Sequence, residues 1–138
     1  MLNSKYRKYN MSLGFFIPFE LPALNQYINA CKGNKHWSSK IKRDVERKIV
    51  AAVINRKKDF LTLEYPLSVT FTWHCKNRMK DPDNIAFGRK FIFDALCGAD
   101  LLEGDGWKQV RQLHDYFPEP RKDHVGVWVE VEKFDGND

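Results

Sequence analysis

Hydrophobic and polar residues alternate in two stretches, one near the middle and one near the end of the chain. In residues 66–76, PLSVTFTWHCK, every odd-numbered position is apolar and the even-numbered ones from Ser68 onward are polar. In residues 124–134, HVGVWVEVEKF, valine fills four alternate positions. A period of two indicates strands that bury one face.

Two further strands are predicted from weaker patterns. Residues 12–22, SLGFFIPFELP, are mostly apolar, but Pro18 and Pro22 restrict them to a sheet edge or a strand end. Residues 107–117, WKQVRQLHDYF, alternate less regularly. The segment 118–123, PEPRKD, is expected to form the loop of a hairpin between the last two strands.

A helical period begins after residue 38. Apolar residues recur every fourth position and Lys/Arg residues occupy the opposite face, which predicts an amphipathic helix to about residue 58. Ser38 and Ser39 are the candidate N-caps. The apolar stripe consists of Ile41, Val45, Ile49 and Val53.

A second helix is predicted over residues 83–97, with Ile85, Ile92 and Leu96 on one stripe and Gly98 as its end. By contrast, residues 23–37 show no clean period. Their segment KGNKH, 32–36, predicts an exposed basic loop.

The predicted order of elements is β-α-β-α-β-β. The economical architecture for two helices and about four strands is a two-layer α+β fold with a mixed sheet. At 138 residues the chain is long enough for one domain with a core. We expect a single domain over residues 12–138, preceded by a flexible basic arm over residues 1–11.

Composition and the lengths of the apolar runs predict where in the cell the protein is located. No apolar run reaches the length that crosses a bilayer, and the N-terminus has no signal-peptide core, so we expect no membrane association. Cys31, Cys75 and Cys97 are an odd number of widely spaced cysteines, which is typical of a reduced compartment. The expected location is therefore the cytoplasm.

Positive charge is concentrated in the first two thirds of the chain. Residues 32–58 contain ten Lys/Arg, opposed only by Asp44 and Glu46. Such a segment suits the binding of a polyanion, because each neutralised phosphate releases counterions. The alternative is a solvated helix flank with no ligand.

Three aspartates are candidates for metal chemistry. Asp81 and Asp83 lie in KDPDN, residues 80–84, directly before the second predicted helix, and Asp105 lies in a glycine-flanked turn before the next strand. If the fold brings the three together, their mutual repulsion favours a divalent cation such as Mg²⁺. The alternative is structural, because Asp and Asn residues at these places are common in helix caps and turns.

The order of these motifs resembles the RusA-type Holliday junction resolvases. KDPDN is followed by a helix with K-x-x-x-D-A-L, residues 90–96, and then by the turn that contains Asp105. The opening strand IPFELPALNQY, residues 17–27, is similar to that of the family as well. The resemblance covers most of residues 14–134, and the combination of motifs is fairly specific although none of its parts is.

The resemblance implies roles for individual residues. Asp81, Asp83 and Asp105 would be the metal-binding and catalytic carboxylates, and Lys90 the functional lysine of the family. Lys80 would take the place of a basic residue that contacts DNA. The offset from Asp83 to Lys90 is seven residues, three more than in the best-known form of the motif. Either the helix starts late and residues 84–88 bulge, or Lys90 contacts DNA instead of the metal-bound phosphate.

Two neighbouring acids complete the candidate set. Glu103 is a candidate accessory ligand, because this turn reads Glu-Gly-Asp where the family has an Asp-Asp pair. Asp94 is expected to pair with Lys90 at the i,i+4 spacing if Lys90 has a structural role.

The resemblance implies a Mg²⁺-dependent endodeoxyribonuclease, with Mn²⁺ as an alternative cofactor, that resolves four-way DNA junctions in recombination and repair. Two symmetric nicks favour a homodimer, and the source would be a bacterial host or a phage. Branched DNA would be held through its phosphates by Lys32, Lys35, Lys40, Lys42, Lys76, Arg78 and Lys80. Two other hypotheses are a non-catalytic DNA-binding module and a metal-dependent nuclease for RNA or flapped DNA.

Overall fold

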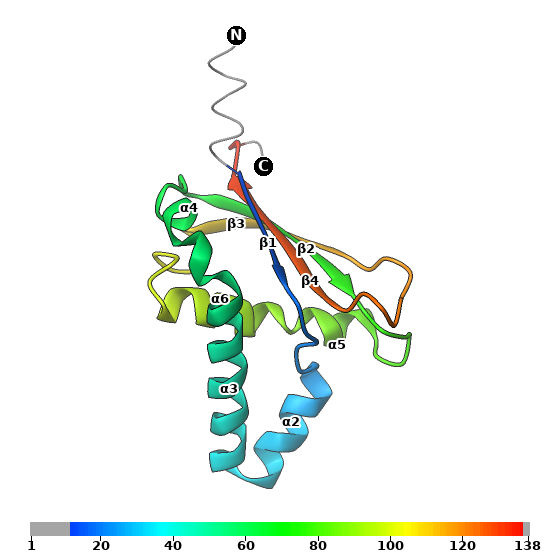
Figure 1. Cartoon of the computed structure of the whole chain (residues 1–138). Coiled ribbons are helices and arrows are strands. Elements are labelled where there is room, and N and C mark those ends of the chain that lie inside the picture. Colours follow the sequence, from blue (N-terminus) through cyan, green and yellow to red (C-terminus); the bar gives the residue numbers. More distant parts are fainter. Residues whose placement is uncertain (1–11, 137–138) are drawn as a thin grey trace.

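The computed structural model describes residues 12–136 and has the expected α+β architecture, with helices packed on one side of a mixed four-stranded sheet (Figure 1). The predicted arm, residues 1–11, lies outside the described residues. Within residues 12–136, none of the helices combines the length and the apolar character needed to cross a membrane.

The sheet has the strand order β1-β4-β2-β3. Its strands are β1 (Ser12–Ile17), β2 (Leu67–His74), β3 (Val110–Tyr116) and β4 (Gly126–Lys133). Strand β4 runs antiparallel to both β1 and β2, whereas β2 and β3 are parallel. The prediction of a β3–β4 hairpin was wrong, because β2 lies between these two strands and residues 117–125 cross its end.

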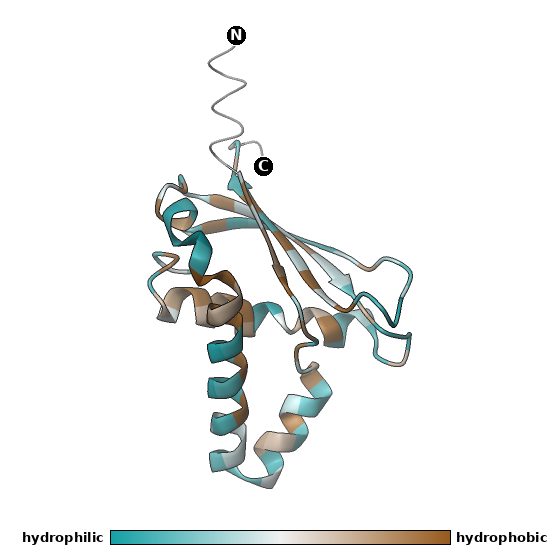
Figure 2. Cartoon of the chain, in the orientation of Figure 1, coloured by the Kyte–Doolittle hydropathy of each residue, from teal (hydrophilic) through white to brown (hydrophobic). Residues whose placement is uncertain are grey.

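The alternation in the sequence does place one face of the sheet in the core. The odd-numbered residues of β2 face the helices and are almost completely buried, as are their neighbours from β1 and β4 (Figure 2). This buried layer consists of Leu13, Phe15, Ile17, Leu67, Val69, Phe71, Trp73, Val127, Val129 and Val131.

Helices α2 (Leu24–Gly33) and α3 (Lys35–Val53) form a hairpin that projects away from the sheet (Figure 1). The loop predicted over residues 32–36 was therefore wrong, although these residues are exposed. Asn34 alone separates the two helices. Its side-chain oxygen accepts a hydrogen bond from the His36 backbone N–H (2.8 Å), so Asn34 is the N-cap of α3. Ser38 is inside the helix and buried.

The helix also ends earlier than residue 58, where the sequence pattern predicted its end. Helix α3 ends at Val53, and a 3₁₀ turn, η1 (Ile54–Arg56), and a short helix, α4 (Lys57–Leu61), follow it. Phe60 of α4 is buried against Phe15 of β1, with ring centroids 5.4 Å apart. The change of direction after Val53 allows the chain to return to the sheet.

The second predicted helix consists of two pieces, α5 (Pro82–Ala86) and α6 (Arg89–Gly98). The break falls at Phe87–Gly88. A Cβ on Gly88 would lie 3.0 Å from the Trp73 ring and 3.1 Å from Leu21, so the backbone approaches the core closely there. The N-cap position is Asp81, whose side chain makes no capping hydrogen bond, and Pro82 is the first helical residue.

Gly126 is a position at which the fold requires glycine. Its φ is +150°, and an added Cβ would lie 2.3 Å from the Ile17 carbonyl oxygen. We predict that Gly126→Ala destabilises the protein by about 1–3 kcal/mol, because it imposes a strained backbone at the first residue of β4. Chemical denaturation measures this loss. Gly33→Ala is the control, since nothing lies within 4 Å of its added Cβ; equal stabilities of the two variants would contradict the prediction.

Candidate functional site

Asp81 and Asp83 lie where the loop after β2 enters α5. Asp81 has an extended backbone (φ −75°, ψ 146°) that Pro82 favours. Asp83 is in the first turn of α5, and its Oδ1 accepts a hydrogen bond from the Asn84 backbone N–H (2.9 Å). Both side chains are exposed. Two carboxylates separated by one residue are thus presented at the surface.

A groove runs beside Asp81. It lies between the loop that follows β2 and the loop that follows β3. Its cationic members are Arg78 and Lys80, and Phe117 with the two prolines of PEP forms part of the opposite wall. The groove is lined by Cys75, Asn77, Arg78, Lys80, Asp81, Pro82, Ile85, Phe117, Pro118, Glu119 and Pro120.

Asp105 lies at the other end of β2. The loop before β3 is attached to the start of β2 by a hydrogen bond from Leu67 N–H to the Gln109 carbonyl (2.7 Å). Glu103 N–H also donates to the Tyr65 hydroxyl (3.0 Å). Since β2 has eight residues, its two ends are about 23 Å apart. Figure 1 shows the loop after α6 and helix α5 at opposite ends of the helical layer.

One chain therefore does not bring the three candidate aspartates together. Across residues 12–136 there is no group of three or more His, Cys, Asp or Glu side chains that could hold a metal ion. The condition for a three-aspartate site, that the fold brings Asp105 beside Asp81 and Asp83, is not met within one chain. The reason is that β3 is parallel to β2, so the chain must travel back to the start of β2 before β3 begins.

The three candidate aspartates share an electrostatic feature. None of them forms an ion pair with a Lys or Arg among the described residues, and all three are exposed. Other aspartates do have such cationic partners, among them Asp44, Asp59, Asp94, Asp115 and Asp123. The carboxylates of Asp81, Asp83 and Asp105 are thus available to an external cation.

Lys90 lies in the first turn of α6, and its ammonium group contacts Asp94 of the same helix (3.1 Å). Asp94 also contacts Lys42 of α3 (3.2 Å), and this hydrogen bond raises the pKa of Lys42. Asp94 therefore links α6 to α3 by way of Lys42. The pairing expected for a structural Lys90 is present, and a catalytic role for Lys90 stays a prediction.

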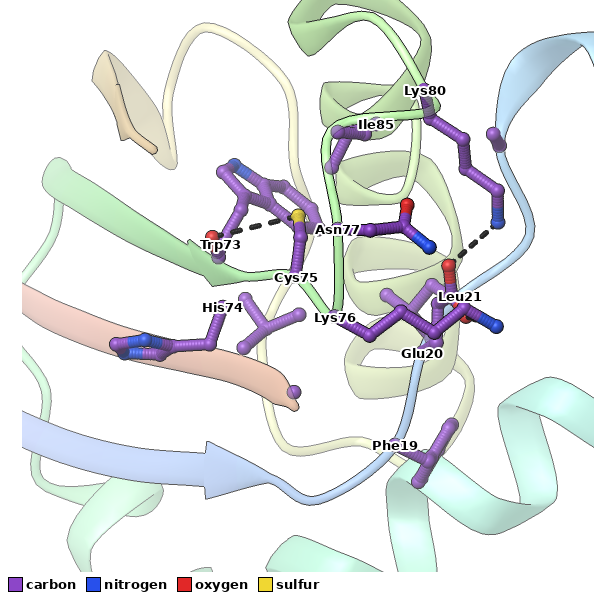
Figure 3. A pocket seen from close by; sticks show the side chains of 13 residues that line it. Phe19, Glu20, Leu21, Trp73, His74, Cys75, Lys76, Asn77, Lys80 and Ile85 are labelled. Atoms are coloured by element: carbon purple, nitrogen blue, oxygen red, sulfur yellow. Dashed lines mark hydrogen bonds and ion pairs between the residues drawn. The ribbon is translucent and has the colours of Figure 1, made fainter. Parts of the chain in front are cut away.

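The predicted DNA-binding residues near the groove are held by two glutamates. Glu20 binds Lys80 (2.6 Å) and lies 3.6 Å from Lys76, as Figure 3 shows for Lys80. Burial raises the pKa of Glu20, but the hydrogen bond and charge of Lys80, together with Lys76, outweigh burial and lower the pKa overall. Arg78 similarly binds Glu119 (2.6 Å). These cations are positioned by acids that a polyanion would have to displace.

Lys32, Lys35 and Lys40 are arranged differently. They lie at the exposed tip of the α2–α3 hairpin, and none forms an ion pair within the described part of the chain. The surrounding sequence, residues 21–43, contains no Asp or Glu at all. The tip therefore carries uncompensated positive charge.

Two polar residues near the groove escaped the sequence analysis. Glu20 looked like part of an apolar strand, and only its position between Pro18 and Pro22 signals a loop. Asp115 occupies an inward-facing position of β3, where it accepts a hydrogen bond from Trp73 Nε1 (2.8 Å) and pairs with Arg89 (3.1 Å). The sequence did contain a signal for Asp115, because this acid occupies a position of the alternating segment 107–117 where an apolar residue is expected.

Comparisons with models of known protein families and with curated proteins gave no match to this chain. The resemblance to the RusA-type resolvases therefore rests on the motifs in the sequence.

The charge at the hairpin tip leads to a prediction about salt. We expect binding to DNA to weaken steeply as salt increases, and the slope of log K against log salt to fall by about 0.9 for each phosphate contact removed. The triple variant Lys32→Ala, Lys35→Ala, Lys40→Ala should show this loss in fluorescence anisotropy titrations. The matched control is Lys57→Ala with Lys58→Ala, two exposed lysines on α4. An equal loss of slope per charge in both variants would show that the tip has no special contact.

Proposed function

We propose that this protein is a Mg²⁺-dependent endonuclease that cuts branched DNA, with the four-way junction as its preferred substrate. The observation that supports this best is the placement of Asp81 and Asp83: two exposed carboxylates without cationic partners, one of which borders a groove with Arg78 and Lys80. A DNA phosphate in that groove would meet Arg78 and Lys80 as well as Asp81, which all line it.

The two aspartates fit the ligand preference of Mg²⁺. This ion commonly takes one or two protein carboxylates, retains several waters and contacts a phosphate oxygen. Asp81 and Asp83 would hold it, and Mn²⁺ is an alternative with similar oxygen preference. When bound, the metal would activate a water and stabilise the charge that develops on the phosphate.

The protein's own residues would supply substrate binding. Arg78 and Lys80 would exchange Glu119 and Glu20 for phosphate oxygens, and Lys76 would follow Lys80. Such contacts position the DNA without reading its sequence. Glu20 and Glu119 hold these side chains at the groove before DNA arrives, so less side-chain freedom is lost on binding.

The separation of Asp105 from Asp83 within one chain bears on the homodimer. A site with three carboxylates would need Asp105 of the partner subunit beside Asp81 and Asp83. A two-fold axis would generate two such sites, one for each of the two nicks that a junction requires. The proposed enzyme would then be inactive as a monomer.

A non-catalytic DNA-binding module is the second candidate. It is favoured by the separation of the acids in one chain and by the Lys90–Asp94 pair, which gives that lysine a structural role. A nuclease for flapped DNA or RNA would use the same residues. Flapped DNA and RNA are therefore assayed as substrates alongside the four-way junction in the experiments below.

We predict that Asp83→Asn lowers cleavage of a synthetic four-way junction by about 100-fold or more, because metal stabilisation worth several kcal/mol is lost. Binding should persist or tighten, since a negative charge near the phosphates is removed. Cleavage and gel-shift assays on one preparation, with Mg²⁺ and with a chelator, test both parts. Asp59→Asn on α4 makes the same chemical change elsewhere and should cleave normally. Full cleavage by Asp83→Asn would contradict the metal site.

Mixing two inactive variants tests the shared site. Asp83→Asn and Asp105→Asn should each be inactive alone. After subunit exchange, a heterodimer would contain one site with both native aspartates and one site with neither, so nicking of one strand should return. If each chain formed its own site, both sites of the heterodimer would be defective and mixing would restore nothing. The product on a denaturing gel distinguishes these outcomes.

A further inference from the structure

Trp37 stands out among the exposed side chains. It lies in the first turn of α3 at the tip of the hairpin, and 55% of its surface is accessible. A folded chain usually buries most of a Trp side chain, and exposed ones are enriched at binding sites. The ammonium group of Lys40 lies 5.8 Å from the centroid of the Trp37 ring, which places a cation directly beside the aromatic surface.

The exposure of Trp37 has a geometric cause. The apolar stripe of α3 recurs every fourth residue, and Trp37 continues it beyond Ile41 toward the tip. Burial falls along this stripe, from Ile49, which is fully buried, through Val45 and Ile41, which are partly buried, to Trp37. The hairpin projects beyond the body that covers its base (Figure 1). The last apolar residue of the stripe is therefore uncovered in this chain.

The charge around Trp37 selects the kind of partner. Residues 21–43 include Lys32, Lys35, Lys40, Lys42 and Arg43 but no acid. Within residues 12–136, Lys42 is the only one of these five that forms ion pairs, with Glu46 of α3 and Asp94 of α6. An exposed aromatic ring beside Lys40, on a tip that also carries Lys32 and Lys35, is complementary to a partner that offers both an aromatic face and negative charge. Nucleic acid offers both at every nucleotide.

The ring distinguishes among forms of nucleic acid. Stacking of a base on an aromatic side chain contributes about 1–3 kcal/mol and tolerates any base. A continuous duplex hides the faces of its bases, whereas single strands and open branch points expose them. We propose that the hairpin tip binds DNA by stacking Trp37 on an unpaired base, with Lys32, Lys35 and Lys40 on the flanking phosphates. That the DNA is branched rests on the proposed function.

Binding measured with a chelator present tests this without any cleavage. The probes are a fluorescein-labelled oligothymidine, a four-way junction and a linear duplex. Trp37→Ala should weaken binding to the first two by about 10-fold, which corresponds to about 1.4 kcal/mol, and should leave the duplex unaffected. The slope of log K against log salt should not change, since the lysines remain. Trp37→Phe should restore most of the affinity because it keeps an aromatic face.

The control is Trp128→Ala. Trp128 is 37% exposed, lies on the face of β4 opposite the buried valines and donates a hydrogen bond to Glu130 (2.7 Å), so its removal should leave binding unchanged. A melting curve for each variant checks the fold. Wild-type affinity in Trp37→Ala, an equal loss in Trp128→Ala, or equal binding of the wild-type protein to polyglutamate would each overturn the proposal. Binding that depends on Trp37 in a protein that never cleaves would support it and refute the endonuclease.

Discussion

The parallel pairing of β2 and β3 is the constraint on which the placement of every candidate residue depends. Parallel strands require a connection that returns the chain to the starting end of the sheet, and here that connection is α5 and α6, whose Phe91, Ile92 and Leu96 are buried beneath the sheet. As a consequence, residues that follow β2 and residues that precede β3 lie at opposite ends. Asp81 and Asp83 belong to the first group and Asp105 to the second.

The charged residues can be divided into those that form ion pairs within the chain and those that do not. Lys42 and Asp94 link α3 to α6, and Lys90 binds Asp94 within α6. Glu20 links the loop after β2 to the segment between β1 and α2. The candidate residues without an ion-pair partner in residues 12–136 include acids at the two ends of the α5–α6 connection and lysines at the hairpin tip. Exposed ion pairs contribute little to stability, so the paired residues mainly set positions, whereas the unpaired ones are available to ligands.

The sequence predicted the strands well because alternation records which face each strand buries. It failed where a single residue decides the outcome. Asn34 alone separates two helices, and the glycine in KGNKH suggested a loop although Gly33 ends α2. The hydrophobic pattern could not predict the strand order. The alternation in residues 107–117 and 124–134 is the same whether these two strands pair with each other or lie on either side of β2. For the candidate site, the exposure of Asp81, Asp83 and Asp105 followed from their turn-like contexts, but the distance between them depended on that strand order.

The break at Phe87–Gly88 changes the meaning of the seven-residue offset between Asp83 and Lys90. On one continuous helix the two would share a face about 10 Å apart along the axis. In the structure they belong to two helices that meet at Phe87 and Gly88, both of which have αR backbone dihedrals, and Gly88 lies close to Trp73 and Leu21. The extra residues therefore form the joint between α5 and α6. No single regular helix joins Lys90 to Asp83, whereas Lys90 and Asp94 lie four residues apart on α6 and form an ion pair. The contact of Lys90 that follows most directly from the sequence is its ion pair with Asp94. Any contact between Lys90 and DNA would have to compete with that carboxylate.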